Sequence, residues 1–171
     1  MWPVAPKHGR KASAYAAAVA EEQVLIERGE VAVMFRRVAD EQTAIARGMA
    51  EVEAAVGLRG RKYHGAFDDD GEEYRVCVQL RESDDPEAFG LEVGTLPGGS
   101  YARVRLSGEP PGVYGLIAPA FRRLCERPDR DRSRPGIEYY RRRDTIDLLL
   151  PVVRDAGGRP GKPSTTSRDA G

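Results

Sequence analysis

Apolar and polar residues alternate along several short segments of the chain, which is typical of β-strands with one buried face. Val31, Val33 and Phe35 share one face of such a segment, and Gly29 separates it from an apolar piece that begins at Val24. The same pattern predicts further strands over residues 63–67, 74–80, 91–95, 101–106, 135–140 and 145–151. The chain is therefore predicted to be rich in β-sheet.

Two segments have apolar residues at helical spacing instead. The first has the apolar positions Ile45, Met49, Val52 and Val56. Asp40 precedes this segment as a candidate N-cap, and Gly57 offers a C-terminal stop. The second segment follows Pro111 and extends to about Glu126. Pro119 lies inside it, and we expect a kink or the loss of one backbone hydrogen bond there.

The predicted elements occur in the same order twice. Strand, helix, strand and strand follow one another over residues 31–82, and again over residues 91–152. Each half has a sheet face that a helix must cover, and two halves side by side leave a cleft along their join. The predicted fold is α+β, with duplicated strand–helix–strand–strand modules that form a pseudo-symmetric antiparallel sheet with two helices and a central cleft.

The ends of the chain differ from its middle in composition. Residues 1–22 contain prolines and then an Ala-rich run, and they are predicted to be a partly disordered N-terminal extension. Residues 154–171 contain Gly, Pro, Ser, Thr and charged residues but no large apolar residue, which predicts a disordered tail. Residues 23–153 are left as a single folded domain.

Charge and cysteine content argue against several classes of protein. The chain has 27 basic and 27 acidic residues, so it has no strong net field to attract nucleic acid or an anionic membrane. No apolar run approaches the length that crosses a bilayer. Cys77 and Cys125 lack metal-ligand spacing with His8 or His64 and are expected to be core thiols. We therefore expect a cytoplasmic protein with no metal, no cofactor and no direct contact with DNA or membrane.

The segment 135–140 contains the most informative polar residue. Alternation along a strand places Glu138 and Tyr140 on one face, and Ile137 and Tyr139 on the other. A glutamate flanked by aromatic residues in a strand is disfavoured by propensity and costly to desolvate. Glu138 is therefore expected either to face solvent or to be kept for a ligand.

Several segments together resemble the GyrI-like small-molecule-binding domain, which is also the effector-binding half of MerR-type and AraC-type multidrug regulators. The resemblance covers residues 22–152, and its carriers are Leu96-Pro-Gly-Gly-Ser-Tyr-Ala102, Gly108, Pro135-Gly-Ile-Glu-Tyr-Tyr140 and the closing Leu150-Pro151. It implies a central pocket in which Glu138 faces hydrophobic, cationic aromatic, drug-like molecules. Phe67, where a tyrosine is expected, and Pro119 depart from the pattern.

The resemblance also suggests which rings would line the pocket. Tyr140 shares the face of Glu138, and Tyr101 begins the equivalent central strand of the other half. The remaining candidates are Phe67, Phe35, Tyr63 and Tyr74. For each of these rings, packing in the core is the alternative.

Three functions remain open. About twenty residues precede the first strand, too few for a helix-turn-helix unit, so we expect a standalone protein that senses or sequesters small molecules. Some members of the resembled family hydrolyse cyclopropane-bearing DNA-alkylating compounds, and Glu138 as base with Tyr140 as acid or orienting group would suit that reaction. A gyrase-inhibitor-like interaction protein is the third, although no sequence feature marks a partner surface.

Overall fold

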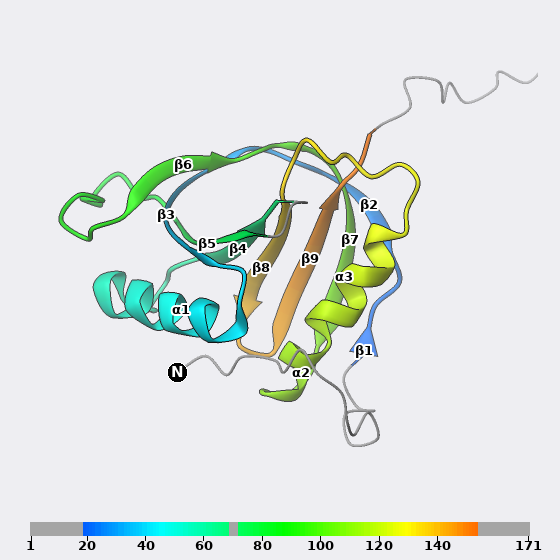
Figure 1. Ribbon diagram of the computed structural model, residues 1–171, viewed down its shortest axis with the longest axis horizontal. Coiled ribbons are helices and arrows are strands. Elements are labelled where there is room, and N and C mark those ends of the chain that lie inside the picture. Colours follow the sequence, from blue (N-terminus) through cyan, green and yellow to red (C-terminus); the bar gives the residue numbers. More distant parts are fainter. Residues whose placement is uncertain (1–18, 69–71, 154–171) are drawn as a thin grey trace, which may run out of the picture.

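The computed structural model describes residues 19–68 and 72–153, and it confirms the predicted α+β class (Figure 1). Its strands form one antiparallel sheet: β1 (Val19–Ala20), β2 (Val24–Arg28), β3 (Val31–Ala39), β4 (Tyr63–Phe67), β5 (Glu73–Gln79), β6 (Glu92–Leu96), β7 (Gly99–Ser107), β8 (Gly136–Arg142) and β9 (Thr145–Pro151). The predicted disorder of the tail 154–171, and of the extension before Val19, lies outside the described residues. Residues 19–20 pair with β7.

The strand order shows the predicted duplication and adds an exchange between the halves. The order is β1-β7-β9-β8-β4-β5-β3-β6, with β2 also paired with β7, so it is symmetric about the β4–β8 pair. One module consists of β2, β3, α1, β4 and β5, and the other of β6, β7, α3, β8 and β9. The first strand of each module pairs with the other module, β2 with β7 and β6 with β3. Each half is therefore completed by the other.

Helix α1 (Gln42–Val56) agrees with its sequence pattern. It begins after Glu41, one residue later than the expected cap, and it ends at Gly57, whose φ of 76° suits glycine. Met49 and Val52 are buried on its inner side and pack against the half of the sheet that contains β3 and β5. The helical spacing of the apolar residues is thus explained by burial against the sheet.

The second helical segment is interrupted, as Pro119 predicted. It is divided into α2 (Gly112–Gly115) and α3 (Ile117–Cys125), with the break at Leu116. A proline has no N–H for the carbonyl oxygen four residues earlier, and its ring clashes with that carbonyl, which here belongs to Gly115. Pro119 itself lies in the first turn of α3, where a backbone N–H lacks an intrahelical partner in any case.

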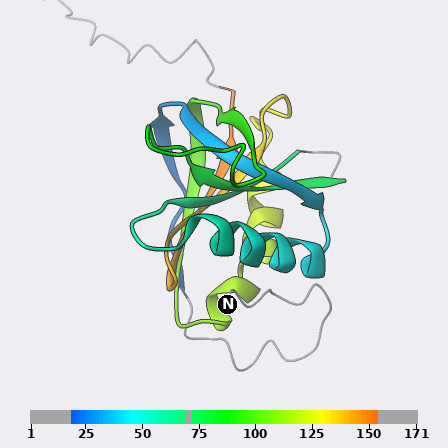
Figure 2. The same ribbon diagram turned by 90° about the vertical axis from the view of Figure 1, so that its left-hand side faces the viewer.

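Both faces of the sheet are buried, because the sheet is strongly curved. The helices pack on one face, which we call the helix face (Figure 2). The strands β2, β3 and β6 arch over the opposite side, the reverse face, which has its own apolar core (Figure 1). The expectation of a single buried face for residues 74–80 is therefore wrong. Tyr74, Val76 and Val78 are buried on the helix face, and Cys77 is buried on the reverse face.

Among the residues that the structure describes, none of the helices combines the length and the apolar character needed to span a bilayer.

Candidate functional site

The site is built on β4 and β8, the two strands at the centre of the symmetric sheet. Their register pairs Tyr63 with Tyr140, Gly65 with Glu138 and Phe67 with Gly136. Paired residues of antiparallel strands point to the same face. Tyr140 and Phe67 contact both the core under α1 and the core under α3. The helix face of the β4–β8 pair therefore lies between the two helical regions.

Glu138 is held by two tyrosine hydroxyls. Tyr74 Oη donates a hydrogen bond to Glu138 Oε2 at 2.7 Å, and Tyr140 Oη donates to the same oxygen at 2.5 Å. The residue is 8% exposed, so the sequence alternative of a solvent-facing glutamate does not hold. Oε1 accepts no hydrogen bond from the described residues. The carboxylate thus keeps one oxygen for a further interaction.

Gly65 makes this contact possible. A Cβ atom at position 65 would lie 1.6 Å from Tyr74 Oη and 3.0 Å from Glu138 Oε2. Tyr74 projects from β5 across β4 to reach the carboxylate on β8, and only a residue without a side chain leaves it space. Gly65 was not among the residues predicted from the sequence. The available signal was a glycine within a strand, which often marks the close approach of another group.

Burial raises the pKa of Glu138 above its ordinary value. The hydrogen bonds from Tyr140 and Tyr74 oppose this rise, and Asp40 adds to it through charge repulsion. Burial also raises the pKa values of Tyr74 and Tyr140 well above their usual range, so both act as neutral donors. No arginine, lysine or histidine of the described residues forms an ion pair with Glu138. Its negative charge is balanced by hydroxyl dipoles alone.

Aromatic side chains flank the carboxylate on the helix face. Phe67 packs edge-to-face against Phe121 of α3, with ring centroids 4.8 Å apart and an interplanar angle of 88°. Tyr63 is buried, and its hydroxyl donates to the carbonyl oxygen of Gly57 at the end of α1 at 2.7 Å. Burial raises the pKa of Tyr63 to about 12. Phe121 was not among the sequence candidates, because its position on a helix stripe is equally typical of a core residue.

Two sequence candidates do not join this group. Tyr101 and Phe35 belong to the core of the reverse face. Tyr101 is completely buried, and its hydroxyl donates to the carbonyl oxygen of Pro97 at 2.6 Å. Tyr101 does point away from the apolar residues of its own strand, as expected, but this direction is the side of the sheet opposite Glu138. The structure therefore brings together Glu138, Tyr140, Tyr74, Tyr63 and Phe67.

The two cysteines differ in their surroundings. Cys77 is buried in the core of the reverse face, whereas Cys125 is only partly buried at the end of α3. Burial raises the pKa of Cys77 to about 12 and also raises that of Cys125. Within residues 19–68 and 72–153, no group of three or more His, Cys, Asp or Glu residues could hold a metal ion.

No protein-family model matches the chain, and a search of curated protein sequences finds no match either. Solved structures do match its fold. An integron cassette protein from the mobile metagenome of Vibrio cholerae has a TM-score of 0.65 and 16% identity, over 80% of this chain and 99% of that chain. The protein SAV2435, solved bound to tetraphenylphosphonium, has a TM-score of 0.55 and 16% identity, over 78% of this chain and 94% of that one. At this identity the likeness establishes the fold alone, and it is compatible with the GyrI-like architecture expected from the sequence.

Proposed function

We propose that this protein binds hydrophobic, cationic aromatic small molecules at Glu138, between α1 and α3, and so senses or sequesters them. The observation that carries this proposal is a buried carboxylate with two hydroxyl donors and no cationic partner among the described residues. Buried charges in proteins are normally paired, and an unpaired one is costly. A bound organic cation would supply the missing charge.

The surrounding side chains suit the same class of ligand. At an effective dielectric constant of 20, two unit charges 4 Å apart attract by about 4 kcal/mol. Aromatic faces add about 0.5–2 kcal/mol for each cation–π contact and require no rigid geometry, which favours broad specificity. Tyr63, Tyr74, Tyr140 and Phe67 are rings on this face. The structural neighbour that binds tetraphenylphosphonium, a bulky aromatic cation, supports this choice of ligand.

Titration calorimetry with tetraphenylphosphonium tests the proposal. Glu138→Gln keeps the shape of the side chain and its ability to accept hydrogen bonds but removes its charge, so we expect at least tenfold weaker binding, or about 1.4 kcal/mol. Glu126→Gln, at the exposed end of α3, is the matched control and should bind like the wild type. Equal affinity of the wild type and Glu138→Gln would refute the electrostatic role of Glu138.

Hydrolysis of cyclopropane-bearing alkylating compounds is a second candidate function. It is favoured by the 2.5 Å contact between Tyr140 Oη and Glu138, which places a proton donor beside a carboxylate with a raised pKa. In this reaction Glu138 would take a proton from water as the water oxygen bonds to a ring carbon, and Tyr140 would protonate the group released when the ring bond breaks. Mass spectrometry should then detect a product heavier than the substrate by one water molecule. Measurable binding with unchanged substrate would exclude hydrolysis and leave the binding function intact.

A further inference from the structure

A second polar cluster lies on the reverse face of the same β4–β8 pair. His64 and Tyr139 are register partners, and their rings stack with centroids 4.7 Å apart. Arg28, at the end of β2, reaches over them: its Nη2 lies 3.2 Å from His64 Nε2, and its Cζ lies 6.0 Å from the Tyr139 ring centroid. Tyr139 is partly exposed and the Arg141 side chain is 47% exposed, so the cluster extends to the protein surface.

The cluster contains donors without acceptors. A guanidinium only donates hydrogen bonds, so His64 Nε2 must accept the bond from Arg28, and the ring proton of neutral His64 lies on Nδ1. Burial and the charge of Arg28 lower the pKa of His64 to about 3, which agrees with a neutral ring. His64 is only 2% exposed, yet its Nδ1 has no partner, and Arg28 Nη1 is likewise buried without one. Both atoms lack the acceptor that buried donors normally have.

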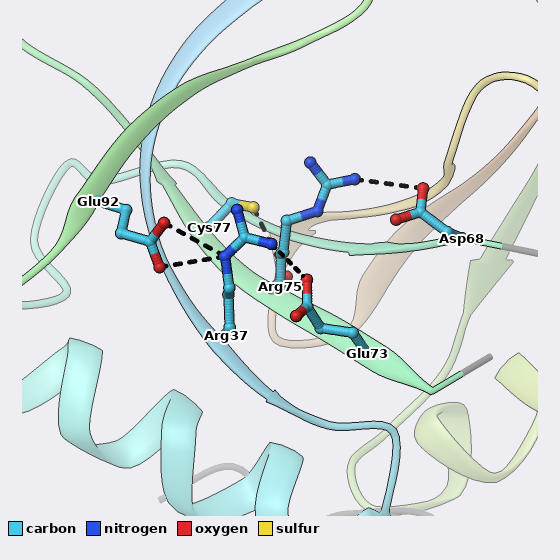
Figure 3. Close-up of polar contacts among 6 residues, drawn as sticks. All are labelled: Arg37, Asp68, Glu73, Arg75, Cys77 and Glu92. Atoms are coloured by element: carbon cyan, nitrogen blue, oxygen red, sulfur yellow. Dashed lines mark hydrogen bonds and ion pairs between the residues drawn. The ribbon is translucent and has the colours of Figure 1, made fainter. Parts of the chain in front are cut away.

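Several other arginines on the sheet have carboxylate partners. Figure 3 shows Arg37, on the half that contains β3 and β5, donating to Glu92 and to Glu73. Within the described ranges, Arg28 has no such partner. Arg28 therefore differs from Arg37 in having no carboxylate to neutralise it.

The carboxylate opposite Tyr139 on β9 is already paired. Asp147 accepts hydrogen bonds from Arg105 at 2.6 and 3.0 Å and from Arg141 at 3.2 Å. Two guanidinium groups thus already share this carboxylate. Burial lowers the pKa of Arg28 against the opposing influences of Tyr101, Tyr139 and Asp147. None of the described carboxylates pairs with its guanidinium. An anion bound beside Arg28 would supply the counter-charge that its guanidinium lacks.

We propose that Arg28 and His64 form a binding site for a small oxyanion, a carboxylate or a phosphate, on the reverse face of the sheet. Arg28 Nη1 would donate to its oxygen atoms, since charge-assisted bonds from arginine to such oxygens are among the strongest in proteins. His64 would hold the guanidinium in place through the contact between its Nε2 and Arg28 Nη2. The site is separate from Glu138, because adjacent residues of β8 point to opposite faces of the sheet. It therefore does not depend on the function proposed above.

Nuclear magnetic resonance of the full chain labelled with 15N-histidine tests the site. Inorganic phosphate and sodium acetate are titrated separately at pH 7 and constant ionic strength. We expect a saturable shift of the His64 ring nitrogen signals, because Nε2 contacts the anion-binding guanidinium, whereas His8, the other histidine of the chain, serves as the internal reference. A response to both anions indicates a general oxyanion site, and a response to one identifies the preferred chemistry. If neither anion shifts His64 more than His8, the proposal is refuted.

Variants show whether Arg28 carries the binding. Arg28→Gln should weaken anion binding at least tenfold, whereas Arg122→Gln, which removes an exposed arginine from α3, should leave it unchanged. Arg28→Lys keeps the charge but has no planar fork, and it should bind with an intermediate affinity, which provides a second test if Arg28→Gln does not fold. Anion affinity that is the same in the wild type and in a folded Arg28 variant would contradict the proposal.

Discussion

The two faces of the β4–β8 pair carry opposite charges, and each face lacks a counter-charge. On the helix face, Glu138 is buried and held only by tyrosine hydroxyls. On the reverse face, Arg28 contacts a neutral imidazole and has a buried N–H without an acceptor. Arg61 and Asp84, by contrast, form a buried bidentate pair at 2.7 and 2.6 Å. The fold therefore can pair buried charges, yet Glu138 and Arg28 on the two faces of the β4–β8 pair have no counter-charge among the described residues.

Filling the space at Gly65 should disturb the helix face most. Gly65→Ala would push Tyr74 away from Glu138, and overpacking of this kind costs about 1–3 kcal/mol. Urea denaturation should show this loss, together with weaker binding of tetraphenylphosphonium. Gly115→Ala is the control, since a Cβ there meets no atom within 4 Å. If Gly65→Ala is as stable as the wild type, the close contact over Gly65 does not exist.

The raised pKa of Glu138 predicts opposite effects of pH on binding and on stability. The folded protein keeps the proton that the unfolded chain loses near pH 4.5, so the contribution of Glu138 to stability is present below pH 4.5 and is lost as pH rises through the folded pKa. Cation binding needs the ionised form, so affinity should increase over this window, by at most about tenfold per pH unit. Calorimetry and urea denaturation across pH measure both trends. Glu138→Gln should show neither.

Removing one hydroxyl from the helix face should have a smaller effect. Tyr74→Phe removes a donor from Glu138 and is expected to cost about 1 kcal/mol. It should also raise the pKa of Glu138 further and weaken cation binding at neutral pH. Tyr114→Phe is the matched control, because its hydroxyl donates to the Arg143 carbonyl oxygen and not to Glu138. That variant should lose a similar amount of stability and keep the cation affinity of the wild type.

The smallest change is expected on the reverse face. Arg28→Met removes a half-buried charge that has no carboxylate partner among the described residues, so the free energy of unfolding should change by less than about 0.5 kcal/mol or should rise. Arg105→Met removes the main partner of Asp147 and should cost about 1.5–3 kcal/mol. Thermal and urea denaturation measure the free energies of unfolding of Arg28→Met and Arg105→Met relative to the wild type. Equal losses would mean that Arg28 is as well paired as Arg105.

The local features of the fold could be predicted from the sequence. The period of two along a strand predicted that Glu138 and Tyr140 share a face, and the hydrogen bond between them confirms it. The helical spacing after Asp40 predicted α1 to within two residues at its start and at its end. The repeated order of elements predicted the symmetric sheet. These features depend on residues that are close in sequence.

The features that a sequence pattern could not predict depend on which strands become neighbours. Tyr74 meets Glu138 only because β5 and β8 both flank β4, with Gly65 between them. Tyr101 and Glu138 lie on opposite faces of the sheet because of the register through β9, and an alternation pattern within one strand does not contain that register. The exchange of β2 and β6 between the halves is likewise a long-range pairing.

The most direct test of the central claim, that Glu138 selects positive charge, uses two ligands of almost the same shape and opposite charge. Titration calorimetry would compare tetraphenylphosphonium with tetraphenylborate on the wild type and on Glu138→Gln. We predict that the wild type binds the cation at least tenfold more tightly than the anion and that most of this preference disappears in the variant. Equal affinities of the wild type for both ions, or a preference that persists in Glu138→Gln, would contradict the account.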